Sequence, residues 1–534
     1  MFPYTVKFMN YIKNVNNIVI FFILVLASIF ISYTYYFDHQ ALVNTSILHN
    51  EDIYKDKQNL FYLIQSNSHP SFLPFIINFF IKIGFSIDFI NVLLSFISTL
   101  LIISGIYLVS KSITTSTFLS ILISITAILL AKNFGDIDYP TLMFSWHTTG
   151  LFAYSLSTLI LGLLTLRNLL FAFLTCLFLM SIHVIVGLWM FGIIVLSSYF
   201  FIEKKNIKKI GIVIFILLIV VLFYANWFTY FAPDIPFEFN QKDYDDYFYY
   251  VEAHRTNYGD LGNLYFEYVL KSLILLTLIL FYLKFDFLNI KTNNNFFLKT
   301  LSMSIIFSGI IYLTYKIFPQ IFPEIAIRTI PQRFFLIHSV VGYPVIISIF
   351  YKFLEKFFIY KKFNKNFSFL LIVTLIILHL IQQHDFIKIR FNNIKIISEN
   401  KIKEHLFWAK VKVLKPQEYI LTSNYLCNKT IIYTNFPILF CFHPIDYIPY
   451  FPKLASPTKE MINKVLGISY EDLKYRNTSG VSEIQIKEIY ENKSFTEWSA
   501  LKKELDFNII IVPREWILDL NLIIDDKYRV YKID

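Results

Sequence analysis

The side chains best suited to acid–base chemistry gather in one polar stretch near the amino terminus. Glu51 and Asp52 stand side by side there, and Asp56 follows four positions later. A carboxylate within hydrogen-bond reach of a hydroxyl group can accept its proton as a general base. Tyr54 and His69 add a phenol and an imidazole to the same stretch. A solvated acidic loop without a catalytic role explains the same residues, so both interpretations stay open.

A pair of arginines, Arg328 and Arg333, is the second candidate group. A guanidinium group matches the geometry of phosphate oxygens and can hold two of them at once. The two arginines flank Pro331, which favours an extended approach to the apolar run that follows. The alternative is a pair that only reaches from a membrane helix into the polar interface.

Five further polar residues join Glu51, Tyr54 and His69 as candidates for lining a cavity. Asp136 and Asp138 form an Asp-x-Asp sequence, which an ordinary turn rich in Gly, Asp and Pro also explains. His183 lies at the end of an apolar run, where an ionisable group indicates function by default, although a short helix turn at the outer surface would also tolerate it. His254 and Arg255 lie in a later polar segment. No spacing matches a zinc-binding motif, so no structural metal is predicted.

Composition decides what kind of protein holds these residues. The chain has 534 residues, of which 56% are hydrophobic and 16% charged, and its mean hydropathy is +0.55. Soluble domains have about 45–50% apolar and about 25% charged residues. This difference excludes a soluble enzyme, a disordered chain and a disulfide scaffold. The net charge of +10 comes mostly from lysines in short loops between apolar runs, so it indicates membrane topology rather than nucleic-acid binding.

The apolar runs predict a polytopic α-helical membrane protein with about 11 transmembrane helices, since a bilayer needs about 20 residues per helix. The predicted spans are 18–37, 89–109, 114–131, 143–166, 168–182, 184–202, 208–228, 264–283, 301–318, 333–352 and 367–383. Residues 168–202 could form one long tilted helix. Two short helices that turn at His183 keep the alternation of loop charges, and we prefer them.

Lysine-rich loops alternate with acidic loops along the chain, which sets the predicted orientation. The loops around Lys111, Lys204, Lys284 and Lys352 are predicted to be cytoplasmic, together with the amino terminus. The acidic loops then lie outside the cytoplasm, and so does everything after Gln383.

Two segments outside the spans complete the predicted organisation. The first outer loop, 38–88, contains an apolar amphipathic stretch that is too short to span and suits a helix in the interface plane. The chain divides into a transmembrane domain, 1–389, and a soluble extracytoplasmic α/β domain, 390–534. In the latter, strands are predicted at 419–422, 430–433 and 508–512, and helices at 483–490 and 496–505. Cys427 and Cys441 could form a disulfide there.

The first outer loop resembles that of the GT-C superfamily of membrane glycosyltransferases, in particular the protein O-mannosyltransferase and lipid A aminoarabinose transferase type. That family has an Asp-Glu pair, a Tyr, a His-Pro-Pro-Leu stretch and a Phe-Gly before the next helices. Here the acidic pair at 51–52 is reversed, Tyr54 and the His-Pro at 69–70 are present, and Ser71 replaces the second proline. The apolar stretch ends in Gly-Phe rather than Phe-Gly, at 84–85.

The resemblance covers residues 1–130 in pattern and the rest only in layout. It implies transfer of a sugar from a polyprenyl-phosphate donor, with inversion, on the outer face of the membrane. The acceptor would be a glycan, a lipid or a protein. The family's catalytic aspartate carries over to Asp52, with Asp56 as the near rival. Arg328 and Arg333 would bind the donor phosphate, and the second acidic outer loop would help to hold a divalent metal or the acceptor.

Two other functions compete with this interpretation. A transporter or flippase of lipid-linked glycans usually needs charged residues near the bilayer midplane, and the predicted spans contain almost none. A polymerase or ligase of surface polysaccharide also uses Arg and His in outer loops. Such enzymes concentrate these residues in a late loop, whereas here they begin in the first.

Overall fold

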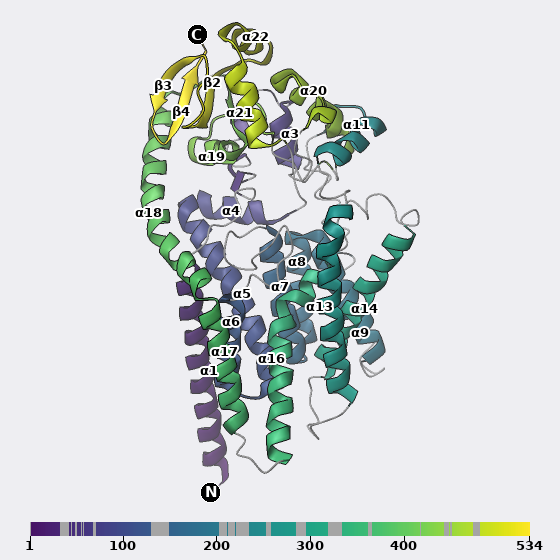
Figure 1. Cartoon of the computed structure of the whole chain (residues 1–534). Helices are drawn as coiled ribbons and strands as arrows, with labels where there is room; N and C mark the ends of the chain where they lie inside the picture. Colours follow the sequence, from purple (N-terminus) through teal and green to yellow (C-terminus); the bar gives the residue numbers. More distant parts are fainter. Residues whose placement is uncertain are drawn as a thin grey trace.

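A computed structural model shows a mainly helical molecule with a small sheet at the end far from the amino terminus (Figure 1). The residues that it describes are 2–32, 42–43, 45–47, 51–54, 56, 58–67, 71–129, 149–201, 211, 219, 234–251, 258–284, 295–318, 334–360, 366–416, 418–442, 448, 451–473 and 481–533.

Helices form at each predicted span whose residues are described. They are α1 (Phe2–Ser32), α5 (Ile87–Thr114), α6 (Thr117–Leu129), α7 (Thr149–Thr165), α8 (Leu169–Ile182), α9 (Val184–Phe201), α13 (Tyr258–Lys284), α14 (Asn295–Ile317), α16 (Phe334–Tyr360) and α17 (Asn366–Gln382). The predicted run 208–228 lies outside the described helices. Among the described residues, α5, α9 and the segment Phe296–Thr314 of α14 are long and apolar enough to cross a membrane.

The outward faces of these helices are apolar. Phe22, Leu26 and Phe30 of α1 are 59%, 64% and 65% exposed, and Leu378 of α17 is 56% exposed. Water-soluble proteins rarely expose contiguous apolar patches larger than a few hundred Å². The chain is therefore a helical membrane protein.

Small residues bring α5 and α7 into close contact at the centre of the bundle. A Cβ atom added to Gly105 of α5 would lie 2.4 Å from the carbonyl oxygen of Thr158 in α7. On the same two helices, the hydroxyl groups of Ser98 and Ser155 are 2.6 Å apart and share a hydrogen bond. Close backbone approach through small residues is the usual packing of membrane helices, because lipid gives apolar side chains no reason to cluster.

The turn predicted at His183 is confirmed, since α8 ends at Ile182 and α9 begins at Val184. His183 Nδ1 accepts a hydrogen bond from the Val186 N–H at 3.5 Å, and the His183 carbonyl accepts one from the Gly187 N–H at 3.0 Å. The histidine therefore stabilises the first turn of α9.

The first outer loop contains two short helices, α3 (Leu60–Asn67) and α4 (Leu73–Lys82). The second is the predicted amphipathic helix, and it lies across the end of the bundle (Figure 1). Its start is fixed to the end of α8, because the Phe72 N–H donates a hydrogen bond of 2.6 Å to the Ser181 carbonyl. Gly84, with φ of 98°, ends this segment in a conformation that other residues rarely adopt.

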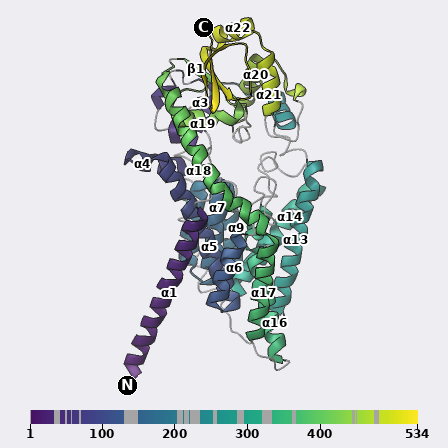
Figure 2. The same cartoon turned by 60° about the vertical axis from the view of Figure 1, so that its left-hand side comes forward.

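A 30-residue helix, α18 (His384–Val413), runs from the bundle to the sheet (Figure 2). The predicted domain boundary at 389/390 therefore falls inside a continuous helix. Beyond it, β1 (Tyr419–Thr422), β2 (Phe507–Pro513), β3 (Asn521–Asp525) and β4 (Tyr528–Lys532) form one sheet in the order β1-β2-β4-β3. Strands β1 and β2 are parallel, and the other pairs are antiparallel. The helices of this part are α19 (Asn424–Thr434), α20 (Ala455–Leu466), α21 (Glu483–Asn492) and α22 (Phe495–Leu505).

The strands predicted at 419–422 and 508–512 and the helices predicted at 483–490 and 496–505 are confirmed. The strand predicted at 430–433 is wrong, because these residues belong to α19. The buried residues of this helix are Leu426, Cys427, Thr430, Ile431, Ile432 and Thr434. Most of them recur every three or four positions, so the segment presents one helical face to the core. Cys427 and Cys441 are both buried and free, so the disulfide considered above is not formed.

Ion pairs attach α18 to the sheet region and α11 (Gln241–Asp246) to α20. Glu404 of α18 lies 2.9 Å from Lys429 Nζ and 3.2 Å from Lys527 Nζ. Burial raises the pKa of Glu404, but these two positive charges outweigh burial and hold the pKa below its usual value. In the same way, Lys459 of α20 pairs with Asp243 of α11 at 2.8 Å.

The close approach of α5 to α7 predicts a strong effect of one methyl group. Replacing Gly105 with Ala should destabilise the protein by about 1–3 kcal/mol, because the new Cβ would overlap the Thr158 carbonyl. Gly192→Ala in α9 is the matched control, since no atom lies within 4 Å of its added Cβ. Thermal unfolding in detergent should show a lower midpoint for Gly105→Ala alone. Equal midpoints for both variants would contradict the contact.

Candidate functional site

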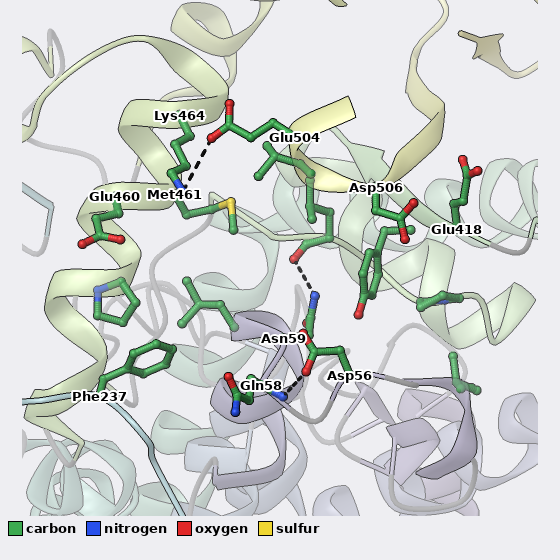
Figure 3. Close-up of a pocket in the computed structure, with 17 residues that line it drawn as sticks. Asp56, Gln58, Asn59, Phe237, Glu418, Glu460, Met461, Lys464, Glu504 and Asp506 are labelled. Atoms are coloured by element: carbon green, nitrogen blue, oxygen red, sulfur yellow. Dashed lines mark hydrogen bonds and ion pairs between the residues drawn. The ribbon is translucent and has the colours of Figure 1, made fainter. Parts of the chain in front are cut away.

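A cavity of about 480 Å³ lies between the first outer loop and the sheet region (Figure 3). Asp56, Gln58 and Asn59 come from the first loop. The opposite walls come from α20, from the end of α22 and from the residues around β1. The volume falls within the roughly 300–1,000 Å³ that is usual for ligand pockets.

Carboxylates dominate the charge of this cavity. They belong to Asp56, Glu418, Glu460, Glu504 and Asp506. The one lysine among the lining residues, Lys464, lies 3.6 Å from Glu504, so its charge is already paired. Such a cavity attracts cations and hydrogen-bond donors and repels phosphate.

Asp56 presents its carboxylate to the cavity from a tight turn. Its Oδ1 accepts a hydrogen bond of 2.8 Å from the Gln58 N–H, and its carbonyl accepts one of 3.2 Å from the Asn59 N–H. Both bonds fix the turn locally, as aspartates commonly do. The side chain is exposed, so a hydroxyl group entering the cavity can reach it.

The pKa of Tyr419 depends on acidic groups from both the first loop and the tail. Burial raises the pKa of this phenol above its usual value, and the negative charges of Asp56 and Asp506 raise it further. Two carboxylates from segments 450 positions apart in the sequence therefore act on the same cavity wall.

Tyr54 does not line the cavity, in contrast to the expectation from the sequence. It is fully buried, and its oxygen accepts a hydrogen bond of 3.0 Å from the Ile438 N–H. Its ring packs against Tyr62 and Tyr419, with centroid distances of 5.4 and 6.3 Å. Burial raises the pKa of Tyr54 well above its usual value, so the phenol stays protonated. Tyr54 thus attaches the first loop to the sheet region.

Asn59 makes a second attachment beside Tyr54. Its Nδ2 donates a hydrogen bond of 3.3 Å to the Leu439 carbonyl, while its Oδ1 accepts one of 2.9 Å from the Tyr62 N–H. The tail segment that carries Leu439 also pairs with β1, because the Leu439 N–H donates to the Ile420 carbonyl at 2.9 Å. Hydrogen bonds therefore run from the first loop into the sheet.

Of the other predicted residues, three are described by the structure and seven are not. Glu51 and Asp52 lie in the short 3₁₀ helix Glu51–Ile53, and the Asp52 side chain is exposed but is not among the residues that line this cavity. His183 is half-buried and stabilises α9, as described above. The remaining predicted residues lie outside the described part of the chain; they are His69, Asp136, Asp138, His254, Arg255, Arg328 and Arg333.

The structure also brings together residues that sequence reasoning missed. Glu418, Glu460, Glu504 and Asp506 are ordinary acidic residues of a soluble region, and no local signal sets them apart. In the bundle, His338 Nε2 and Ser304 Oγ are 2.8 Å apart, and Trp189 Nε1 donates to the same oxygen at 3.4 Å. A histidine within an apolar run is the signal that could have drawn attention to this polar cluster.

Within the described residues, no group of three His, Cys, Asp or Glu side chains is arranged to hold a metal ion. Models of known protein families do not match this chain, and neither does any curated protein sequence. The resemblance stated above therefore rests on the first-loop motif and on the layout of the chain.

The buried hydrogen bond of Tyr54 predicts how firmly the first loop is attached. Tyr54→Phe leaves the Ile438 N–H without its acceptor, which should cost about 1–3 kcal/mol. Hydrogen exchange of the Ile438 amide should become faster by the factor that corresponds to this loss of free energy. Tyr249→Phe is the control, since Tyr249 is 54% exposed and its replacement should change stability by less than about 0.5 kcal/mol. Unchanged exchange at Ile438 would show that the phenol is not the anchor.

Proposed function

We propose that this protein is a membrane glycosyltransferase that moves a sugar from a polyprenyl-phosphate donor to an acceptor on the outer face of the membrane. The observation that carries the proposal is the exposed Asp56 carboxylate on the first outer loop, in a cavity roofed by the sheet region. The first-loop motif supports the same reaction, because the family that it resembles has its catalytic aspartate in this loop.

In this reaction the Asp56 carboxylate takes the proton of an acceptor hydroxyl group. The hydroxyl oxygen forms a bond to the anomeric carbon as the bond between sugar and phosphate breaks, and polyprenyl phosphate leaves. We favour Asp56 over Asp52 as the base because Asp56 lines the cavity and Asp52 is not among its lining residues. Asp52 remains the rival candidate.

The charge of the cavity assigns it to the acceptor rather than to the donor phosphate. Carboxylates and a paired lysine would repel a phosphate group, whereas they can accept hydrogen bonds from sugar hydroxyls. The donor phosphate then needs its own positive charge, for which we propose Arg328 and Arg333.

We also propose that about 11 helices span the membrane, with a cytoplasmic amino terminus and an extracytoplasmic sheet region. Two observations support this orientation. Lys111 and Lys352 lie near each other, as Lys111 Nζ donates to the Thr115 carbonyl at 2.8 Å and Lys352 Nζ to Thr115 Oγ1 at 3.3 Å. Figure 1 shows the corresponding end of the bundle on the side of the amino terminus, as the positive-inside rule requires.

Reporter fusions test this orientation. A phosphatase reporter that is active only outside the cytoplasm should be active after Asp534 and inactive after Lys291. A fluorescent reporter that folds only in the cytoplasm should give the reverse pattern. A cytoplasmic signal at Asp534 would move the sheet region to the other side and remove the outer-face reaction.

The role of Asp56 is tested with purified protein in liposomes, supplied with a panel of polyprenyl-phosphate sugars and membrane-derived acceptors. Asp56→Asn should lower the release of polyprenyl phosphate by about 10²–10⁴-fold, because the amide keeps the shape but cannot take the proton. Glu515→Gln is the control, an exposed acid of the sheet region that does not line the cavity.

Asp52→Asn is measured alongside. Loss of activity in Asp52→Asn with full activity in Asp56→Asn would make Asp52 the base. Full activity in both variants would remove the first loop from the chemistry.

A further inference from the structure

An apolar groove of about 520 Å³ lies beneath α4, on the membrane side of the first outer loop. Its walls come from α4, α5, α7 and α8. Thr175 is the one residue among its lining that carries a polar side-chain group. The cavity with Asp56 and this groove share no lining residue, so they are different sites.

The mouth of the groove is continuous with the apolar surface of α8. Phe171, Leu174 and Phe178 line the groove and are 57%, 49% and 39% exposed. Leu170, beside them, is 57% exposed without lining the groove. In a membrane protein this surface faces hydrocarbon, so the groove opens to the interior of the bilayer.

The length of the groove matches one leaflet. Along α5 its lining extends from Ile90 to Leu101, which corresponds to about 16 Å at roughly 1.5 Å per residue. Half of a bilayer core is about 15 Å thick. The chain of a polyprenyl carrier is much longer than one leaflet, whereas one acyl chain of a phospholipid fits.

The end of α4 offers a charge for the headgroup. Lys82 is exposed in the last turn of this helix, on the polar face opposite the residues of α4 that line the groove, at the level of the lipid headgroups. An ammonium group at the interface attracts the anionic phosphodiester of a lipid whose chain lies in the groove.

We propose that this groove binds one acyl chain of an anionic phospholipid from the leaflet on the side of the sheet region. The bound chain fills the space between α4 and the helices below it. Helix α4 is part of the first outer loop, so the lipid supports the loop that carries Asp56. The proposal does not depend on the glycosyltransferase function.

The test uses the full-length protein in nanodiscs that contain phosphatidylglycerol with a diazirine in the middle of one acyl chain. After illumination, mass spectrometry identifies the labelled residues. We expect labelling at Leu94, Ile97 and Leu156 to exceed that at Phe22 and Leu26, which lie on the exposed face of α1. Equal labelling of the groove and of α1 would mean that lipid only surrounds the protein, and would overturn the proposal.

Filling the groove should displace the chain. Leu156→Trp should lower groove labelling by about tenfold, the effect of withdrawing roughly two methylene groups from contact. Leu170→Trp is the control on the same exposed surface and should leave labelling unchanged. If Leu156→Trp does not fold, Ile97→Phe at a half-buried position of the lining replaces it.

Two further measurements decide the nature of the ligand. Lys82→Gln should weaken labelling by phosphatidylglycerol more than labelling by a zwitterionic phosphatidylcholine probe. Polyprenyl phosphate added in equal amount should compete poorly. Efficient competition by polyprenyl phosphate would assign the groove to the carrier chain and overturn the proposal, without bearing on the role of Asp56.

Discussion

The attachment of the first outer loop to the sheet region depends on one buried phenol. Tyr54 accepts a hydrogen bond from a backbone N–H that lies 384 positions further along the chain. Because the phenol is completely buried, breaking this bond leaves a donor without water to replace its partner. Asn59 adds a second bond to the next residue of the same tail segment. Asp56, on one wall of the cavity, lies between these two anchors in the sequence, so the two bonds help to fix its position.

The two parts of the molecule that the loop contacts are each held together by interactions of their own. At the bundle, the Phe72 N–H fixes the start of α4 to the end of α8, and the contact of α5 with α7 through Gly105 leaves little freedom for relative movement. On the other side, α18 holds the sheet through the pairs of Glu404 with Lys429 and Lys527. The first loop is therefore attached both to the helical bundle and to the sheet region, which favours a fixed position for its carboxylates.

The sequence allowed prediction of features that depend on local patterns. Apolar runs about 20 residues long gave the helices, and the turn at His183 followed from the alternation of loop charges. The strand prediction at 430–433 was wrong, because burial on one helical face outweighed the strand propensity of the β-branched residues. The cavity could not be predicted, since its acids come from positions 56, 418, 460, 504 and 506, which only the fold brings together. Tyr54 was predicted to line a cavity because the sequence does not show that a distant segment buries it.

The two cavities described above have opposite chemistry, and this separation constrains any reaction at the first outer loop. Above α4, five carboxylates repel a phosphate group. Below α4, the groove is almost free of polar groups and offers nothing to an acceptor rich in hydroxyls. In the proposed reaction, the donor therefore approaches from the membrane and the acceptor from the side of the sheet. Donor and acceptor then meet at the level of α4. The sugar of the simplest donors carries no charge, so the carboxylates do not repel it. Transfer then moves the neutral sugar onto the acceptor beside Asp56, while the leaving phosphate stays on the membrane side, away from the carboxylates.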